Sequence, residues 1–320
     1  MTWLCIMEQW QVLNSRSSRH VRTSQTPQTI HHWVRALAMK AFFAPALAVL
    51  GQWTHLSSAQ SYPFTAEQER NANRTLSVGY VVYHGYTILD VFGPVQFLSA
   101  LSWPFNITLS IIAKETGPVH SRPPVHHGPN GSEMDMSKMI DAQIIATHTF
   151  ETAPPLDVII VTGGVGDLTL MEKKDRSIED FIASRFDKIE YILSVCSGSG
   201  FLARAGILDG RRATATKSVW SHITRGGKNV TWVPSARWVQ DGKIWTSSGV
   251  TAGMDMMVAF LRHIYGDPVV NNSVNNAEYA PHVDPSWDPF SIVHKVPGAN
   301  TSIPMQSLVG PLTEYPESSP

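Results

Sequence analysis

Cysteine is scarce in this chain: Cys5 and Cys196 are its only two cysteines among 320 residues. Two thiols do not make the disulfide framework that holds small secreted domains together. Neither stands in the spacing of cysteine and histidine that is typical of a zinc site, so we expect no bound metal. The stability of the fold must therefore come from a hydrophobic core, which a hydrophobic content of 43% can supply.

Charged residues and long apolar runs are also few. Charged residues make up 16% of the chain and the net charge is -1, which excludes a strongly basic surface for nucleic acid or anionic membrane. The apolar run at 41–50 is too short to span a bilayer comfortably. We therefore expect a globular protein that takes a small-molecule substrate, with no nucleic-acid partner and no stable membrane span.

The N-terminal part differs from the rest of the chain. Residues 1–38 show no clear period, and we interpret them as an unstructured extension upstream of a true start at Met39. Lys40, the apolar run after it and the small residues ending at Ala59 are typical of a signal peptide over residues 39–59. The alternative is a short amphipathic helix packed on the domain.

The chain has six acceptor motifs for N-glycosylation, whereas chance predicts about two for this composition. Cleavage after Ala59 would remove Cys5 and leave Cys196 as the single thiol of the mature chain. We therefore predict a secreted glycoprotein. Its candidate glycosylation sites are Asn73, Asn106, Asn130, Asn229, Asn271 and Asn300.

From residue 76 onwards, strand-like and helical patterns alternate. This alternation predicts an α/β fold with a doubly wound, mostly parallel sheet and helices on both faces. We assign residues 60–75 to a linker, 76–280 to a catalytic domain and the Pro-rich residues 281–320 to an irregular tail. Ligands bind beyond the carboxyl ends of such strands, so we expect the loops at 84–90, 163–167 and 196–200 to converge.

Cys196 lies at an expected strand-to-helix elbow. The apolar run 191–195 stops at the cysteine, small residues follow at 197–200, and a helical pattern then begins. A thiol at such an elbow is exposed and sits at the positive end of a helix dipole, and both effects favour the reactive thiolate. The alternative is a buried structural cysteine that packs as a small hydrophobe.

Asp90 is the candidate proton carrier for this thiol. It is flanked by apolar residues, and desolvation of a carboxyl in such surroundings raises its pKa. The alternative is a helix N-cap, a common position for aspartate. Gly163 and Gly164 end another strand, where backbone N–H groups would face a developing negative charge together with the N–H of Ser197. Their spacing does not match a dinucleotide-binding loop, and we expect no cofactor.

In combination, these segments resemble the DJ-1/PfpI family over roughly residues 76–280. Within that family the chain is most similar to the isonitrile hydratase branch, in which the acid stands in a Leu-Asp-…-Gly-Pro context and a hydroxyl residue follows the cysteine. The motifs that carry the resemblance are Leu89-Asp90-Val91-Phe92-Gly93-Pro94, Thr162-Gly163-Gly164, Ser194-Val195-Cys196-Ser197-Gly198, Gly206 to Thr214 and Thr246 to Asp255.

The resemblance implies a flavodoxin-like sheet and a homodimer. It also implies that Cys196 is the nucleophile, Asp90 its acid partner, and Gly164 and Ser197 the anion-binding residues. Protease-like members carry histidine directly after the cysteine, where this chain has Ser197, so peptide hydrolysis is not expected. Other members carry a histidine in an Ala-Thr-Thr-His stretch, which here reads Ala213-Thr214-Ala215-Thr216-Lys217, so that base is absent too.

The function that follows is addition of water to an isocyanide to give an N-formamide, through a cysteine thiolate and an aspartate that acts as acid and base. This would make the protein a hydro-lyase. The alternative is a non-catalytic sensor of a ligand or of redox state, in which Cys196 is oxidised to a sulfinate stabilised by Asp90. A glyoxalase-like or amidotransferase-like activity is disfavoured because the histidines are absent.

Overall fold

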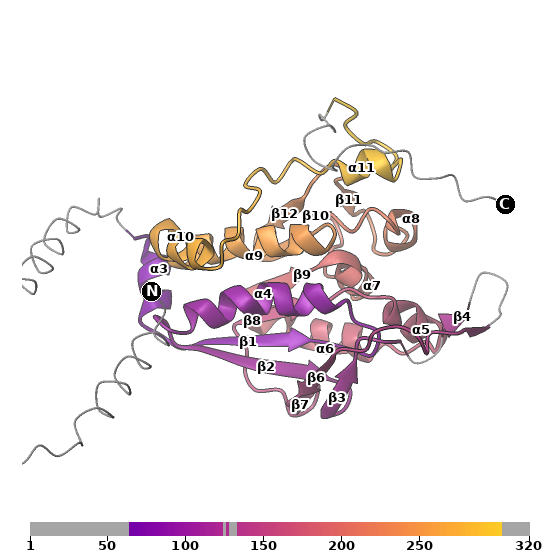
Figure 1. Ribbon diagram of the computed structural model, residues 1–320, viewed down its shortest axis with the longest axis horizontal. Coiled ribbons are helices and arrows are strands. Elements are labelled where there is room, and N and C mark those ends of the chain that lie inside the picture. The colour runs from indigo at the N-terminus through magenta and orange to yellow at the C-terminus, as the bar shows by residue number, and fades with distance from the viewer. Residues whose placement is uncertain (1–63, 124–125, 128–132, 303–320) are drawn as a thin grey trace, which may run out of the picture. The chain divides into compact units, whose positions relative to one another are not determined.

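A seven-stranded sheet forms the centre of the computed structural model, which describes residues 64–123, 126–127 and 133–302. The strand order is β12-β13-β9-β8-β1-β2-β7, and all neighbours are parallel except β12 and β13 (Figure 1). The strands are β1 (Leu76–Val81), β2 (Ile107–Ala113), β7 (His148–Thr149), β8 (Val158–Val161), β9 (Tyr191–Ser194), β12 (Trp238–Asp241) and β13 (Ile244–Ser247).

Helices cover both faces of this sheet, because successive side chains of a strand point to opposite sides. On β8, Val158 and Ile160 enter one hydrophobic core and Ile159 enters the other. The first core is completed by α4 and α9 and the second by α6 and α7, which confirms the doubly wound α/β prediction. The helices are α3 (Ala66–Ala72), α4 (Ile88–Leu101), α5 (Gly166–Glu172), α6 (Ser177–Arg185), α7 (Ser199–Arg204), α8 (Trp220–Ile223), α9 (Val250–Tyr265), α10 (Asp267–Asn276) and α11 (Phe290–Val293).

Short strands outside the main sheet form three two-stranded pairs. Two pairs are antiparallel and lie between β2 and β7 in the chain, and the third is parallel. They are β3 (Gly117–His120) with β6 (Gln143–Ala146), β4 (His126–His127) with β5 (Glu133–Met134), and β10 (Arg212–Ala213) with β11 (Thr231–Trp232).

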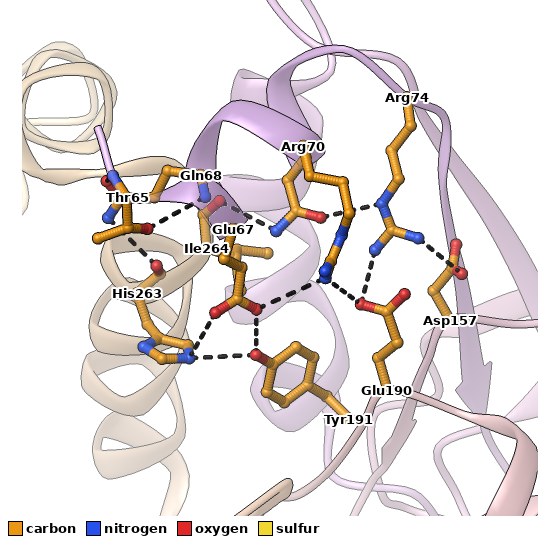
Figure 2. Close-up of polar contacts among 11 residues, drawn as sticks. Thr65, Glu67, Gln68, Arg70, Arg74, Asp157, Glu190, Tyr191, His263 and Ile264 are labelled. Atoms are coloured by element: carbon orange, nitrogen blue, oxygen red, sulfur yellow. Dashed lines mark hydrogen bonds and ion pairs between the residues drawn. The ribbon is translucent and has the colours of Figure 1, made fainter. Parts of the chain in front are cut away.

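Part of the segment expected to be a linker is a helix packed on the domain. Thr65 and Gln68 form a capping box at the start of α3. The side-chain amide of Gln68 donates to the carbonyl groups of Arg262 and His263, and that of Asn71 donates to Ile264. Figure 2 shows Gln68 beside His263 and Ile264. These carbonyls belong to the last turn of α9, where main-chain donors run out; only that of Arg262 also accepts from the N–H of the C-cap Gly266. The helix therefore forms because it caps α9, a contact that lies far away in the sequence.

The tail expected to be irregular is also attached to the domain over its described residues. Asp288 is fully buried and forms an ion pair with Lys217 at 3.5 Å, and the carbonyl of Pro285 accepts from the backbone N–H of Arg237. The short helix α11 follows. Residues 1–38, the segment 39–59 and Asn130 lie outside the described residues.

Candidate functional site

Cys196 lies where β9 turns into the 3-10 helix Cys196–Gly198 and then α7, at the strand-to-helix elbow that the sequence predicts. Its φ is +59°, a left-handed conformation that is rare for residues other than glycine. Neighbouring segments hold it there, because its N–H donates to Ser248 at 2.9 Å and its carbonyl accepts from the N–H of Thr216 at 3.3 Å. A strained backbone of this kind is common at functional sites.

Gly163 allows the two predicted site residues to meet. A Cβ atom at this position would lie 2.8 Å from Asp90 Oδ2 and 2.8 Å from Cys196 Cβ. The backbone N–H of Gly163 donates to Asp90 Oδ2 at 3.2 Å, and its carbonyl accepts from the N–H of Thr87 at 2.9 Å. The loops after β1, β8 and β9 therefore converge as expected, and only glycine fits between them.

Asp90 is the third residue of α4 and is fully buried. The N-cap is Thr87, so the alternative interpretation of Asp90 as an N-cap is wrong. Its carboxyl forms a hydrogen bond with the Cys196 side chain, while Oδ1 has no hydrogen-bond partner among the described residues. Burial raises the pKa of Asp90 to about 7, against the opposing effect of the hydrogen bonds from Gly163 and Cys196.

The Gly-Pro pair after Asp90 explains how this turn of α4 is held. Pro94 has no N–H, so the carbonyl of Asp90, four residues earlier, lacks its helical donor. The hydroxyl of Tyr80, on β1, donates to that carbonyl instead. Gly93 lies against α9, where a Cβ atom would stand 2.7 Å from Met254 Cγ. The motif therefore anchors Asp90 to the sheet and α4 to α9.

The expectation of a free thiolate at Cys196 is opposed by its surroundings. Burial raises the pKa of the thiol, and the negative charge of Asp90 raises it further. Hydrogen bonds from the Thr216 side chain and the Ser197 N–H act in the opposite direction without reversing the shift. Desolvation outweighs the helix dipole here, so in the resting site the thiol keeps its proton and the neighbouring carboxyl is the group that titrates near neutral pH.

Gly164 and Ser197 lie together, but not in the way that the sequence predicts. The N–H of Gly164 donates to Ser197 Oγ at 2.9 Å, so this N–H group is already occupied. A Cβ atom on Gly164 would come within 2.2 Å of the carbonyl of Gly85, and the φ of +152° also requires glycine. The N–H of Ser197 does point at the reacting centre, where it hydrogen-bonds to the Cys196 sulfur.

A pocket of about 410 Å³ opens in front of the thiol. Thr216 contributes a hydroxyl to the wall and lies in the stretch 213–217, where some members of the DJ-1/PfpI family carry a histidine. Asp167 ends the loop at 163–167 that the sequence predicts to reach the site, but no motif identifies Asp167 or His222 as a site residue. The wall also contains Thr87, Gly164, Val165, Leu168, Cys196, Ser197, Ser218, Val219 and Ile223.

Metal binding has no support in this part of the chain. Within residues 64–123, 126–127 and 133–302 there is no group of three or more histidine, cysteine, aspartate or glutamate side chains arranged to hold a metal ion.

Proteins similar in sequence include an enzyme and a regulator. The isonitrile hydratase of Pseudomonas putida is 31% identical over 207 residues, which are 64% of this chain and 79% of that enzyme. The HTH-type transcriptional regulator GbdR of Pseudomonas aeruginosa is 27% identical over 182 residues, or 57% of this chain. The chain spans 46% of the length of that regulator.

Solved structures show the same fold. The crystal structure of a THiJ/PfpI family protein from Pseudomonas syringae matches with a TM-score of 0.52 at 27% identity, over 71% of this chain and 85% of that one. DJ-1beta of Drosophila melanogaster matches with a TM-score of 0.52 at 16% identity, over 65% of this chain and 100% of that one. The second likeness concerns the fold alone.

The prediction of a secreted glycoprotein with a signal peptide is wrong. Neither the relatives nor the described residues support export, and no helix in the described ranges is long and apolar enough to cross a membrane. Several of the sequon asparagines instead stabilise local structure through their carboxamides. That of Asn73 donates to the carbonyl of Glu69, and those of Asn271 and Asn300 accept from Arg262 and Ser302.

A family model supports the same assignment as the motifs and the fold. The DJ-1/PfpI family model matches residues 77–263, which is more than half of the chain and includes Asp90, Gly163 and Cys196. The chain therefore belongs to the DJ-1/PfpI family.

Proposed function

We propose that this protein is an isonitrile hydratase-like enzyme, a hydro-lyase that adds water to an isocyanide and releases an N-formamide. The observation that carries the proposal is the convergence of Asp90 and Cys196 at Gly163, where a Cβ atom would lie 2.8 Å from both Asp90 Oδ2 and Cys196 Cβ. The 31% identity to an isonitrile hydratase supports it. Apolar wall residues such as Val165, Leu168 and Val219 suit the carbon substituent of the isocyanide, and no cofactor is required.

The proposed reaction begins with the thiol of Cys196 and the carboxylate of Asp90. Sulfur attacks the terminal carbon of R–N≡C while its proton passes to Asp90. Asp90 then gives this proton to the same carbon, which leaves the thioimidate Cys196–S–CH=N–R. Water adds to the carbon, the C–S bond breaks, and HCO–NH–R leaves as the thiol is restored. One water is consumed in each cycle and no electrons are exchanged.

A carboxyl with a pKa near 7 is suited to this sequence, because a general acid-base catalyst works best when its pKa lies near the working pH. Asp90 accepts a proton from the thiol and returns it to carbon without help from a histidine. The raised pKa of the Cys196 thiol is also consistent with a nucleophile that is deprotonated only when it attacks.

The test is incubation of purified protein with an aliphatic or an aryl isocyanide, with the formamide measured by chromatography. Wild type is expected to turn over, Cys196→Ala to be inactive, and Asp90→Asn to lose about 100-fold or more in rate. The absence of turnover by wild type with both substrates would refute the proposal. Equal turnover by Cys196→Ala would refute it as well.

A second candidate is a non-catalytic sensor, favoured by the 27% identity to a transcriptional regulator. Oxidation of Cys196 to a sulfinate by mild peroxide would require the thiolate, which burial and Asp90 disfavour. Intact-mass spectrometry separates the two functions. Rapid and selective addition of two oxygens at Cys196, in a protein that turns over neither isocyanide, would favour the sensor.

A further inference from the structure

His222 is a histidine of the Cys196 pocket that no motif identifies. It lies on α8 and lines the same pocket as Cys196. Its Nε2 atom is buried and forms no hydrogen bond within the described part of the chain. A buried ring nitrogen without a partner costs free energy, and such groups in a binding pocket commonly await a bound molecule.

His222 and Asp90 differ in their access to the pocket. Asp90 is 0% exposed and is not part of the described pocket wall, whereas His222 is part of that wall. A water molecule that enters the pocket meets His222 without meeting Asp90. The hydrolytic half of the proposed reaction uses such a water, and it therefore needs a base on the pocket side.

Asp167 also lines the pocket, but a guanidinium engages its carboxyl. Arg204 lies 2.6 Å from Asp167 Oδ1 and 2.6 Å from Glu179 Oε1, and all three side chains are largely buried. Burial raises the pKa of Asp167, whereas the charges of Arg204 and His222 lower it. Because Arg204 engages Asp167, His222 is the better-placed base among the pocket residues.

We propose that His222 is a second catalytic residue, whose neutral imidazole takes a proton from the water that hydrolyses the Cys196 thioimidate. This inference rests on the proposed function. The water oxygen bonds to the thioimidate carbon, one water proton goes to His222, the C=N electron pair moves to nitrogen, and His222 then gives its proton to that nitrogen. The hydroxyl then becomes the formamide carbonyl as the C–S bond breaks, and its proton passes to the departing sulfur, which restores the thiol and leaves Asp90 ionised as at the start.

Single-turnover kinetics separate the two halves of this reaction. Wild type and His222→Gln are mixed with an aryl isocyanide and quenched in acid at increasing times. Intact mass then reports the protein that carries one substrate on Cys196. In His222→Gln the adduct is expected to form at the wild-type rate. Its breakdown is expected to be slower than in wild type by a factor of up to about 100. Adduct formation also shows that the variant is folded, and His222→Asn provides a second variant.

His148→Gln is the matched control, since His148 lies on the edge strand β7 and outside the pocket. It is expected to behave as wild type. If wild type turns over and His222→Gln breaks down its adduct at the same rate, the role of His222 is refuted while the proposed function stands. If wild type neither forms the adduct nor releases formamide, the proposed function itself is refuted, and this role of His222 is refuted with it.

Discussion

Replacement of Asp90 by asparagine is expected to stabilise the protein, and only at higher pH. Burial raises the pKa of Asp90 from its ordinary value of 3.8 to about 7. Between these values the folded protein holds a proton that the unfolded chain has released, so the free energy of unfolding of wild type falls as the pH rises. This rise in the pKa corresponds to a loss of about 4 kcal/mol in the free energy of unfolding. The loss is complete above pH 7 and absent below pH 3.8.

Asparagine keeps the shape of the side chain and an oxygen that accepts from the N–H of Gly163, but it does not ionise. The difference in unfolding free energy between Asp90→Asn and wild type should therefore grow by up to about 4 kcal/mol from pH 4 to pH 8. Urea denaturation at each pH measures it. The measurements stop at pH 8, because ionisation of the Cys196 thiol changes the free energy of unfolding only at higher pH.

The matched control is Asp180→Asn, which removes a carboxyl whose side chain is 75% exposed. Its stability difference should stay within about 0.5 kcal/mol over the same range. A difference between Asp90→Asn and wild type that does not change with pH would refute the reasoning. It would mean that Asp90 is as well solvated in the folded protein as in the unfolded chain.

Three further outcomes follow from the same site. The kcat/KM for an isocyanide should rise about tenfold for each pH unit below 7 and level off above pH 7, because the ionised Asp90 must accept the thiol proton. A kcat/KM that does not change with pH would exclude that role. Tyr80→Phe should lower the free energy of unfolding by about 1–3 kcal/mol, measured in urea, because the buried carbonyl of Asp90 loses its donor; unchanged stability would show that the hydroxyl is dispensable. Gly163→Ala should abolish turnover, because its Cβ atom would collide with Asp90 and Cys196; activity near that of wild type would show that the three loops can separate.

Several parts of the fold are predictable because their signals are local. The apolar spacing at 88–101 and 250–265 predicts helices with the bounds that α4 and α9 have in the structure. The turn at Asp241 and Gly242 predicts the antiparallel hairpin of β12 and β13. Periodicity of 3.6 or 2 residues is present in a short stretch of chain, whatever that stretch later contacts.

Other parts depend on contacts that no local pattern reports. The capping box at Thr65 is visible in the sequence, but α3 is held by carbonyl groups of α9 almost two hundred residues away. The described tail residues are ordered because Asp288 pairs with the buried Lys217. Both segments have the polar or Pro-rich composition of a linker, and only their distant partners give them a defined structure.

The sequence by itself determined the family, the elbow that carries Cys196 and the position of Asp90, since each follows from residues that are neighbours in the chain. Only the tertiary structure decided the state of these groups. Burial of the elbow raises the pKa of the thiol that a helix end was expected to lower, and the N–H of Gly164 is engaged by Ser197. Desolvation and hydrogen-bond satisfaction depend on what surrounds an atom in space, so segments far apart in the chain set them.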